Sequence, residues 1–126
     1  EEGECTWWVA QERPDVLRWL PPSNADAHTW DDWAINEDWG AFYGLHVGHY
    51  PTAGDIAVWE TSCGGPYATN GHVAYVTGVR GNGNIIVVNE ANLDNDGQVY
   101  YGSEYEIRPY TCMRFIHKPT VFEGEP

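Results

Sequence analysis

The sequence predicts an α+β domain in which N-terminal helices pack on an antiparallel sheet of about five to six strands. In the first 40 residues, apolar side chains recur at helical spacing. After residue 54 the chain changes to short strand-like stretches separated by turns rich in glycine and asparagine. Helices followed by antiparallel strands are typical of the α+β class. With 126 residues, the chain is expected to form a single domain over residues 1–126.

Three helical segments are expected before residue 40. They cover Cys5–Arg13, Asp15–Leu20, and a third range that starts at Ser23 or Asn24 and ends near Asp38. Prolines separate the segments. In the third segment, Trp30, Trp33 and Ala34 form an apolar stripe, which predicts that they pack in the core. Asp31 and Asp32 are expected to face water.

Six strand-like segments follow a loop over residues 40–54. They are Asp55–Glu60, Gly71–Val79, Asn84–Asn92, Gln98–Gly102, Tyr105–Tyr110 and Met113–Lys118. Gly81–Gly83 and Asn95–Gly97 have the composition of tight turns, so we expect the chain to reverse there. Asp94 and Asp96 are interpreted as turn residues, because their spacing lacks the full ligand set of a calcium loop.

The charge of the chain excludes two classes of partner. Nineteen acidic residues against six basic ones give a formal net charge of −13. Binding to nucleic acid or to an anionic lipid surface needs a basic patch, so neither is expected. The longest wholly aliphatic run, Ile85–Val88, is too short to span a membrane. Seven tryptophans and eight tyrosines exceed what a small core needs, and some are expected to line a groove or an interface.

The three cysteines, Cys5, Cys63 and Cys112, allow two interpretations. In a secreted protein the simplest is one disulfide plus one free thiol, and we expect Cys63 to pair with Cys112. In a cytosolic protein all three would be reduced. Cys5 begins the first expected helix, where backbone N–H groups and the helix dipole favour the nucleophilic thiolate. It is therefore a candidate catalytic residue, with a buried structural cysteine as the alternative.

His72 is the candidate base because polar side chains are expected beside it. A three-residue turn at Gly81–Gly83 places His72 opposite Asn92 and diagonal to Glu90, on one face of the sheet. A carboxylate or an amide next to an imidazole fixes its tautomer and stabilises the imidazolium. The remaining histidines are interpreted as structural; they are His28, His46, His49 and His117. Because no CxxC or HxxxH pair is present, we expect no metal site and no cofactor.

Several motifs, in matching order over residues 3–117, resemble those of CHAP domains, the cysteine- and histidine-dependent amidohydrolase/peptidase modules. Residues 3–10, Gly-Glu-Cys-Thr-Trp-Trp-Val-Ala, resemble the opening motif of that family. Residues 51–59 resemble its central Pro-x-x-Gly-Asp-Ile-Ala-Val-Trp segment, and residues 71–76 its histidine strand. Residues 89–92, Asn-Glu-Ala-Asn, resemble the segment that carries the acid and the amide, and residues 115–117 the closing strand.

The resemblance implies a papain-like fold of the NlpC/P60 type. It also implies cleavage of an amide bond in peptidoglycan, either the muramoyl–alanine amide or a peptide bond in the stem or cross-bridge. In such an enzyme Cys5 is the nucleophile, His72 the base and then the acid, and Glu90 orients His72. Asn92 is an auxiliary polar residue, and the substrate groove is walled by Trp7, Trp59 and Tyr75. The expected location is extracellular or in the cell wall, where disulfides form.

Two departures from the family pattern bear on activity. Glu4 stands where the family often has glutamine, and its carboxylate opposes formation of the Cys5 thiolate. Some members bind calcium through acidic residues upstream of the cysteine; with only four residues there, this chain is expected to lack that site. No signal peptide opens the chain, so a leader or an upstream region is expected outside it.

The alternative function is a secreted structural module that keeps the CHAP fold with a weak or inactive site. The acidity of the chain and its surplus of aromatic residues allow such a module to form a homo-oligomer or a larger assembly.

Overall fold

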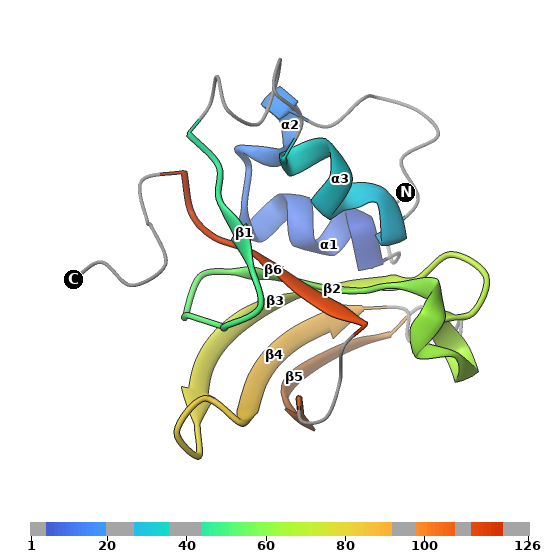
Figure 1. Ribbon diagram of the computed structural model, residues 1–126, viewed down its shortest axis with the longest axis vertical. Helices are drawn as coiled ribbons and strands as arrows, with labels where there is room; N and C mark the ends of the chain where they lie inside the picture. Colours follow the sequence, from blue (N-terminus) through green and yellow to red (C-terminus); the bar gives the residue numbers. More distant parts are fainter. Residues whose placement is uncertain (1–4, 20–26, 36–43, 92–97, 108–111, 120–126) are drawn as a thin grey trace.

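A computed structural model describes residues 5–19, 27–35, 44–91, 98–107 and 112–119. It contains a six-stranded sheet in which all neighbouring strands are antiparallel. In chain order the strands are β1 (Val47–Gly48), β2 (Ile56–Trp59), β3 (His72–Arg80), β4 (Ile85–Ala91), β5 (Val99–Glu106) and β6 (Met113–Ile116). Across the sheet the order is β1-β6-β2-β3-β4-β5, so the last strand lies between the first two (Figure 1).

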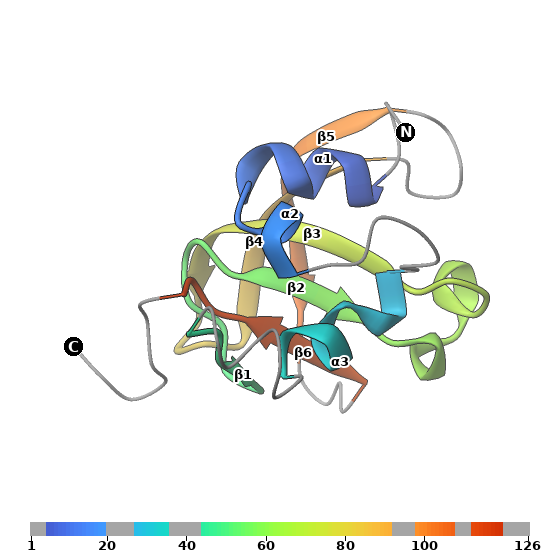
Figure 2. The ribbon, with the colours of Figure 1, turned by 90° about the horizontal axis from the view of Figure 1, so that it is seen from above.

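The helical segments lie together on one face of this sheet (Figures 1 and 2). They are α1 (Cys5–Glu12), α2 (Val16–Trp19), the 3₁₀ turn η1 (Ala27–Thr29) and α3 (Trp30–Ala34). Two further 3₁₀ turns, η2 (Thr61–Cys63) and η3 (Gly65–Tyr67), connect β2 to β3. The helical layer and the antiparallel sheet confirm the predicted α+β class. Within the described residues, no helix has the length and apolar character needed to cross a bilayer.

Apolar side chains pack on both faces of the sheet. Beneath the helices lies a cluster of buried residues: Val9, Val16, Trp19, Ala27, Trp30, Ala34, Leu45, Ile56, Val58, Val73 and Ile116. A second cluster covers the opposite face: Ala57, Trp59, Ala74, Val76, Ile86, Val88, Met113 and Phe115. Because β2 contributes to both clusters, all four of its residues are buried, which explains its uninterrupted apolar sequence.

The first two expected helices are found close to their expected bounds. The third is shorter, since α3 ends at Ala34 and η1 precedes it; the expected caps Ser23 and Asn24 and the expected end at Asp38 lie outside the described residues. The expectation that Asp31 faces water is wrong, because only 7% of its surface is exposed. In the structure Asp31 hydrogen-bonds the side chain of Glu60, which follows β2.

Two strand predictions need correction. The loop expected over residues 40–54 contains β1, whose two residues pair with β6. The separate strands expected at Gln98–Gly102 and Tyr105–Tyr110 form one strand, β5, which ends at Glu106. The interruption expected at Gly102 is a bulge, because Glu90 pairs with Tyr100 whereas Val88 pairs with Ser103. Gly102 has a φ of 70°, a conformation that glycine adopts without strain.

Arg13, which directly follows α1, ties the helical layer to the far end of the sheet. Its buried guanidinium donates hydrogen bonds to the backbone carbonyls of Gly54, Ile116 and His117 at 2.9, 3.0 and 3.0 Å. It also forms an ion pair with Asp15 at 2.7 Å. Planar guanidinium groups suit this role because they offer several donors in a fixed fork. Arg13 thus supplies buried donors to three backbone carbonyl groups of the sheet region.

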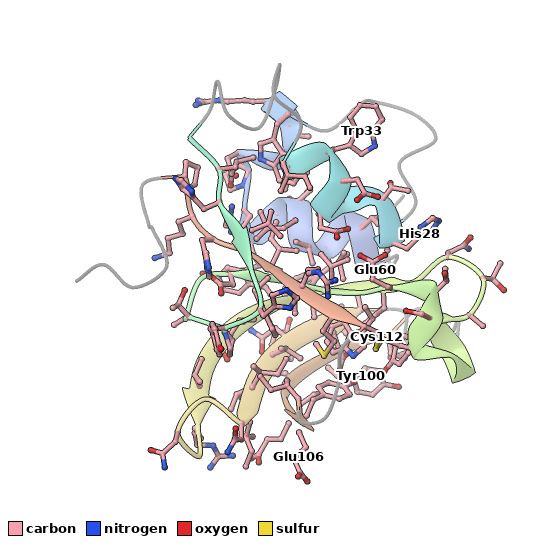
Figure 3. All side chains as sticks on the ribbon, viewed as in Figure 1. His28, Trp33, Glu60, Tyr100, Glu106 and Cys112 are labelled. Carbon is pink, nitrogen blue, oxygen red and sulfur yellow. A yellow bond between two sulfur atoms is a disulfide. The ribbon has the colours of Figure 1, made fainter. Side chains whose placement is uncertain are left out.

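The expected disulfide between Cys63 and Cys112 is present in the structure, with the two Cα atoms 5.4 Å apart. It joins η2 to the residue before β6 (Figure 3). Beside it, the Glu60 amide donates a hydrogen bond to the Cys112 carbonyl at 2.9 Å. The connection between β2 and β3, which leads directly to His72, is therefore fixed to the closing strand.

Candidate active site

His72 is the first residue of β3, and the residues before it set its position. Gly71 has a φ of 72°, and a Cβ on it would clash with the Trp59 carbonyl and with His28 of η1. Only glycine fits there. The His28 amide donates a hydrogen bond to the Asn70 carbonyl at 2.9 Å, so η1 holds the chain immediately before His72.

The register expected between β3 and β4 is found near the site, although the turn differs from the expected one. The turn covers four residues, 81–84, and Arg80 pairs with Ile85, one residue out of the expected register. A bulge at Thr77 compensates, so that Tyr75 pairs with Asn89 as expected. The two deviations cancel before the strands reach His72.

The His72 imidazole is hydrogen-bonded to Glu90, with Nε2 2.8 Å from the Glu90 Oε1 atom. Both side chains are buried, at 4% and 1% exposure. A carboxylate accepts at this position, so the proton lies on Nε2 and the lone pair on Nδ1. That tautomer is the one a base needs if Nδ1 takes up a proton.

Glu90 is held as a carboxylate by several donors. Burial alone would raise its pKa, but hydrogen bonds from His72, Tyr105 and Ser103 outweigh burial, and the pKa lies below its usual value. The Tyr105 hydroxyl donates to Glu90 Oε2 at 2.7 Å, so each carboxylate oxygen has a partner. Neither Tyr105 nor Ser103 was identified from the sequence, because their face becomes clear only once the bulge at Gly102 is known.

Aromatic rings enclose this pair of side chains. The Trp59 ring lies 5.1 Å from the His72 ring and the Tyr67 ring 5.8 Å from it. Trp59 stacks on Tyr67 at 5.7 Å and meets Tyr105 edge-on at 5.2 Å. Such surroundings lower the local dielectric and strengthen the hydrogen bond between His72 and Glu90.

The structure describes the backbone of Cys5 but not its side chain. Cys5 is the first residue of α1, as expected, and α1 packs against β3. In both views the N-terminal end of α1 lies on the same side of the molecule as the start of β3 (Figures 1 and 2). Asn92 lies outside the described residues, so its place beside His72 stays a prediction.

The expected groove residues are not brought together in the described part of the chain. Trp59 is 2% exposed, covered by Tyr67, and so supports His72 from within the core instead of lining a surface. Tyr75 lies on the face of Val73, opposite His72, because side chains alternate along a strand. The side chain of Trp7 lies outside the described part of the chain.

An acidic cluster lies where β2 ends, one residue beyond Trp59. It comprises Glu60 with Asp31 and Asp32 of α3, and His28 lies on the same side of the molecule (Figure 3). Burial, and then the hydrogen bond and negative charge of Asp31, raise the pKa of Glu60 to about 8. Glu60 is therefore mostly protonated at neutral pH and can donate a hydrogen bond to Asp31. The buried Oδ1 atom of Asp31 has no hydrogen-bond partner among the residues that the structure describes.

The other histidines differ from His72 in their surroundings. His117, which follows β6, is fully buried and its Nδ1 lies 2.8 Å from Asp55 Oδ1. His28 packs against Gly71, and His49 is exposed. Among the described residues, no three histidine, cysteine or acidic side chains are arranged to hold a metal ion.

The geometry can therefore provide an oriented base at the start of β3. A buried carboxylate fixes the imidazole tautomer, as in nucleophile–base–orienter sets. The Gly-Glu-Cys-Thr-Trp-Trp-Val-Ala motif starts a helix at Cys5, and the His72 motif starts a strand that this helix packs on.

Comparison with known proteins identifies the family of this chain. The family model described as "CHAP domain" matches residues 1–92. The chain belongs to the CHAP domain family. The matched region includes the expected catalytic residues Cys5, His72 and Glu90, which the structure describes, and Asn92, which lies outside the described residues.

Two curated relatives of this chain come from staphylococci. The chain is 33% identical over 118 residues to the N-acetylmuramoyl-L-alanine amidase sle1 of Staphylococcus haemolyticus, covering 91% of this chain and 31% of that protein. It is 35% identical over 85 residues to the probable autolysin SsaALP of Staphylococcus aureus, covering 68% of this chain and 28% of that protein. The chain thus spans about a third of the length of these relatives.

Solved structures show the same fold. A crystal structure of an N-acetylmuramoyl-L-alanine amidase from Staphylococcus aureus matches with a TM-score of 0.65 and 26% identity, covering 91% of this chain and 30% of that one. The crystal structure of Ly7917 matches with a TM-score of 0.62 at 23% identity, over 93% of this chain and 53% of that one. The second match concerns the fold alone.

Proposed function

We propose that this CHAP domain hydrolyses an amide bond in peptidoglycan, with Cys5 as nucleophile, His72 as base and Glu90 as the residue that orients His72. The observation that carries the proposal is the 2.8 Å hydrogen bond between His72 Nε2 and Glu90, which prepares Nδ1 to accept a proton. The amidase and autolysin names of the relatives support peptidoglycan as the substrate.

The mechanism is acyl transfer. His72 removes the Cys5 proton, and the thiolate attacks the carbonyl carbon of the amide. Backbone N–H groups at the start of α1 stabilise the oxyanion, because a helix N-terminus offers unpaired donors there. The imidazolium of His72 then protonates the leaving amine, and water, deprotonated by His72, releases the acyl group and regenerates the thiol. Asn92 is proposed as an auxiliary polar residue at the same end of the sheet.

The substrate bond is proposed to be the muramoyl–alanine amide or a peptide bond of the stem or cross-bridge. The amidase relatives support the first of these. Action outside the cell or in the wall is supported by the Cys63–Cys112 disulfide, since such bonds persist in oxidising compartments.

The experiment is a turbidity assay on purified peptidoglycan, followed by mass analysis of the released fragments. A new amino-terminal alanine identifies the amidase reaction, and a free terminus within the peptide identifies an endopeptidase. Cys5→Ser and His72→Ala should abolish hydrolysis, whereas His49→Ala, a change of an exposed loop histidine, should leave it intact.

Iodoacetamide labelling separates nucleophile chemistry from fold. We expect Cys5 to react at neutral pH faster than an ordinary cysteine thiol, and the rate to fall in His72→Ala. Full hydrolysis by Cys5→Ser would refute the catalytic assignment. A folded wild-type protein that neither hydrolyses peptidoglycan nor labels quickly would favour the structural module instead.

A further inference from the structure

Strand β5 carries a tyrosine that reaches the proposed site from the edge of the sheet. We propose that Tyr105 is a positioning residue, whose hydroxyl holds the Glu90 carboxylate in the orientation that directs it at His72. This inference rests on the proposed function, because it gives Tyr105 a role in the same proton transfer.

The bulge in β5 creates this contact. Before the bulge Tyr100 pairs with Glu90, and after it Ser103 pairs with Val88 and Tyr105 with Ile86. The extra residue changes the alternation of side chains, so that after the bulge the odd-numbered residues of β5 share the face of Glu90. Without the bulge, Ser103 and Tyr105 would point to the other face.

The contact is specific in its geometry. Tyr105 donates to Oε2 at 2.7 Å while His72 occupies Oε1 at 2.8 Å, so the carboxylate is held at both oxygens and cannot rotate without losing one. The Trp59 ring lies 5.2 Å from the Tyr105 ring and limits its movement. A hydrogen bond of this kind to a charged group is among the stronger ones in proteins.

The surroundings of Tyr105 keep its hydroxyl protonated. Burial, and then its hydrogen bond with Glu90 and its contact with Tyr67, raise the pKa of the Tyr105 phenol far above the usual value. The polar groups of the described residues around Glu90 are His72 from β3, Ser103 and Tyr105 from β5, with Tyr67 from η3 beyond them. The Tyr105 phenol therefore stays protonated at neutral pH and can donate to the Glu90 carboxylate.

The substitution that tests the proposal is Tyr105→Phe, which removes the hydroxyl and retains the ring against Trp59. Its matched control is Tyr101→Phe, which removes the hydroxyl of a tyrosine that is 69% exposed on the same strand. On peptidoglycan we expect Tyr105→Phe to lower kcat about tenfold with little change in KM, because orientation matters in the transition state. The acid limb of the pH profile should move to higher pH, since Glu90 loses a donor that favours its charged form. Tyr101→Phe should match the wild type.

A double-substitution cycle distinguishes positioning from general support of the fold. If Tyr105 acts through Glu90, adding Tyr105→Phe to Glu90→Gln should cause no further loss of kcat. Equal losses in both backgrounds would overturn the proposal.

Nuclear magnetic resonance of the His72 ring tests the inference without any activity, so failure of the proposed function remains distinguishable. In Tyr105→Phe we expect the titration of the His72 ring to move, because Glu90 loses a donor that favours its charged form. A second measurement uses the wild type and needs no substitution. The chemical shift of the Tyr105 ring carbon that bears the hydroxyl should change as His72 titrates. An unchanged titration of His72 in Tyr105→Phe, or a silent Tyr105 carbon in the wild type, would refute the role.

Discussion

Two imidazole–carboxylate pairs with the same hydrogen-bond length lie in different parts of this molecule. His72 contacts Glu90 through Nε2, and His117 contacts Asp55 through Nδ1, each at 2.8 Å. His72 begins a strand, among aromatic rings and hydroxyl donors. His117 follows the last strand, is fully buried, and shares its carboxylate with the Thr52 amide and hydroxyl at 2.6 and 2.7 Å.

The difference shows that residue type alone does not define a catalytic pair. Asp55, His117 and Arg13 connect the loop before β2, the end of β6 and the end of α1 through buried polar contacts. That arrangement holds the sheet to the helices. The His72 pair instead lies on the strand that the proposed nucleophilic helix packs against. One pair stabilises the fold, and the other is the pair that we propose to move a proton.

The largest expected effect is on activity. His72→Ala should lower the rate of peptidoglycan hydrolysis at least about a thousandfold, because a general base and acid is lost. His117→Ala, assayed at low temperature where it stays folded, should keep the rate within a few-fold of the wild type. Comparable loss in both variants under conditions where both are folded would contradict the division of roles.

The next largest effect is on stability, where the change at His117 should cost more than the change at His72. His117→Ala leaves the buried Asp55 carboxylate without its ring partner, and we expect the free energy of unfolding to fall by about 3–5 kcal/mol. His72→Ala leaves Glu90 with hydroxyl donors, and the expected loss is about 1–2 kcal/mol. Urea unfolding of the two variants measures both values. A larger loss in His72→Ala would reverse the comparison.

Glu90 should also contribute to the pH dependence of stability on the acid side. Its pKa in the folded protein lies below the ordinary value of 4.5, so its contribution is present above pH 4.5 and disappears as the pH falls through the folded pKa. The difference in unfolding free energy between wild type and Glu90→Gln should therefore shrink between pH 6 and pH 3. A difference that stays constant over this range would show that Glu90 is not held as a carboxylate.

The smallest effect concerns Glu60 on the neutral side. Its folded pKa of about 8 exceeds the ordinary 4.5, so the folded state holds an extra proton between these values. Its contribution to stability is therefore complete below pH 4.5 and falls as the pH rises to 8. Melting temperatures at pH 5 and pH 8 should differ less in Glu60→Gln than in the wild type. An identical decrease in both proteins would contradict the raised pKa of Glu60.

The sequence predicted the elements that depend on local pattern. The helix starts at Cys5 and the strand at His72, because both follow motifs and turn residues that act over a few positions. The Glu90 contact was also predicted, although the turn was taken as three residues and the bulge at Thr77 was not foreseen. Two compensating errors gave the correct partner.

The contacts that were missed depend on residues far apart in the chain. Asp31 is polar and was placed in water, but its partner Glu60 is 29 positions away and could not be inferred from helical spacing. Gly102 was interpreted as a strand end because glycine often interrupts strands, whereas here it permits a bulge. That bulge decides which face Tyr105 occupies, so the complete set of Glu90 partners required the three-dimensional pairing.

The position of β6 between β1 and β2 has a consequence for the synthesis of this chain. During translation β2 can pair with β3 soon after both are made, but its other edge stays unpaired until β6 is made, more than 50 residues after β2. Two of the three carbonyl partners of Arg13 are at positions 116 and 117. The guanidinium therefore lacks these two hydrogen bonds until the same segment has been made. The domain therefore completes its core only after residue 117 has emerged. A stalled nascent chain in which β6 is still inside the exit tunnel should remain sensitive to protease. A chain longer by about a dozen residues, so that β6 has left the tunnel, should become protected in a single step.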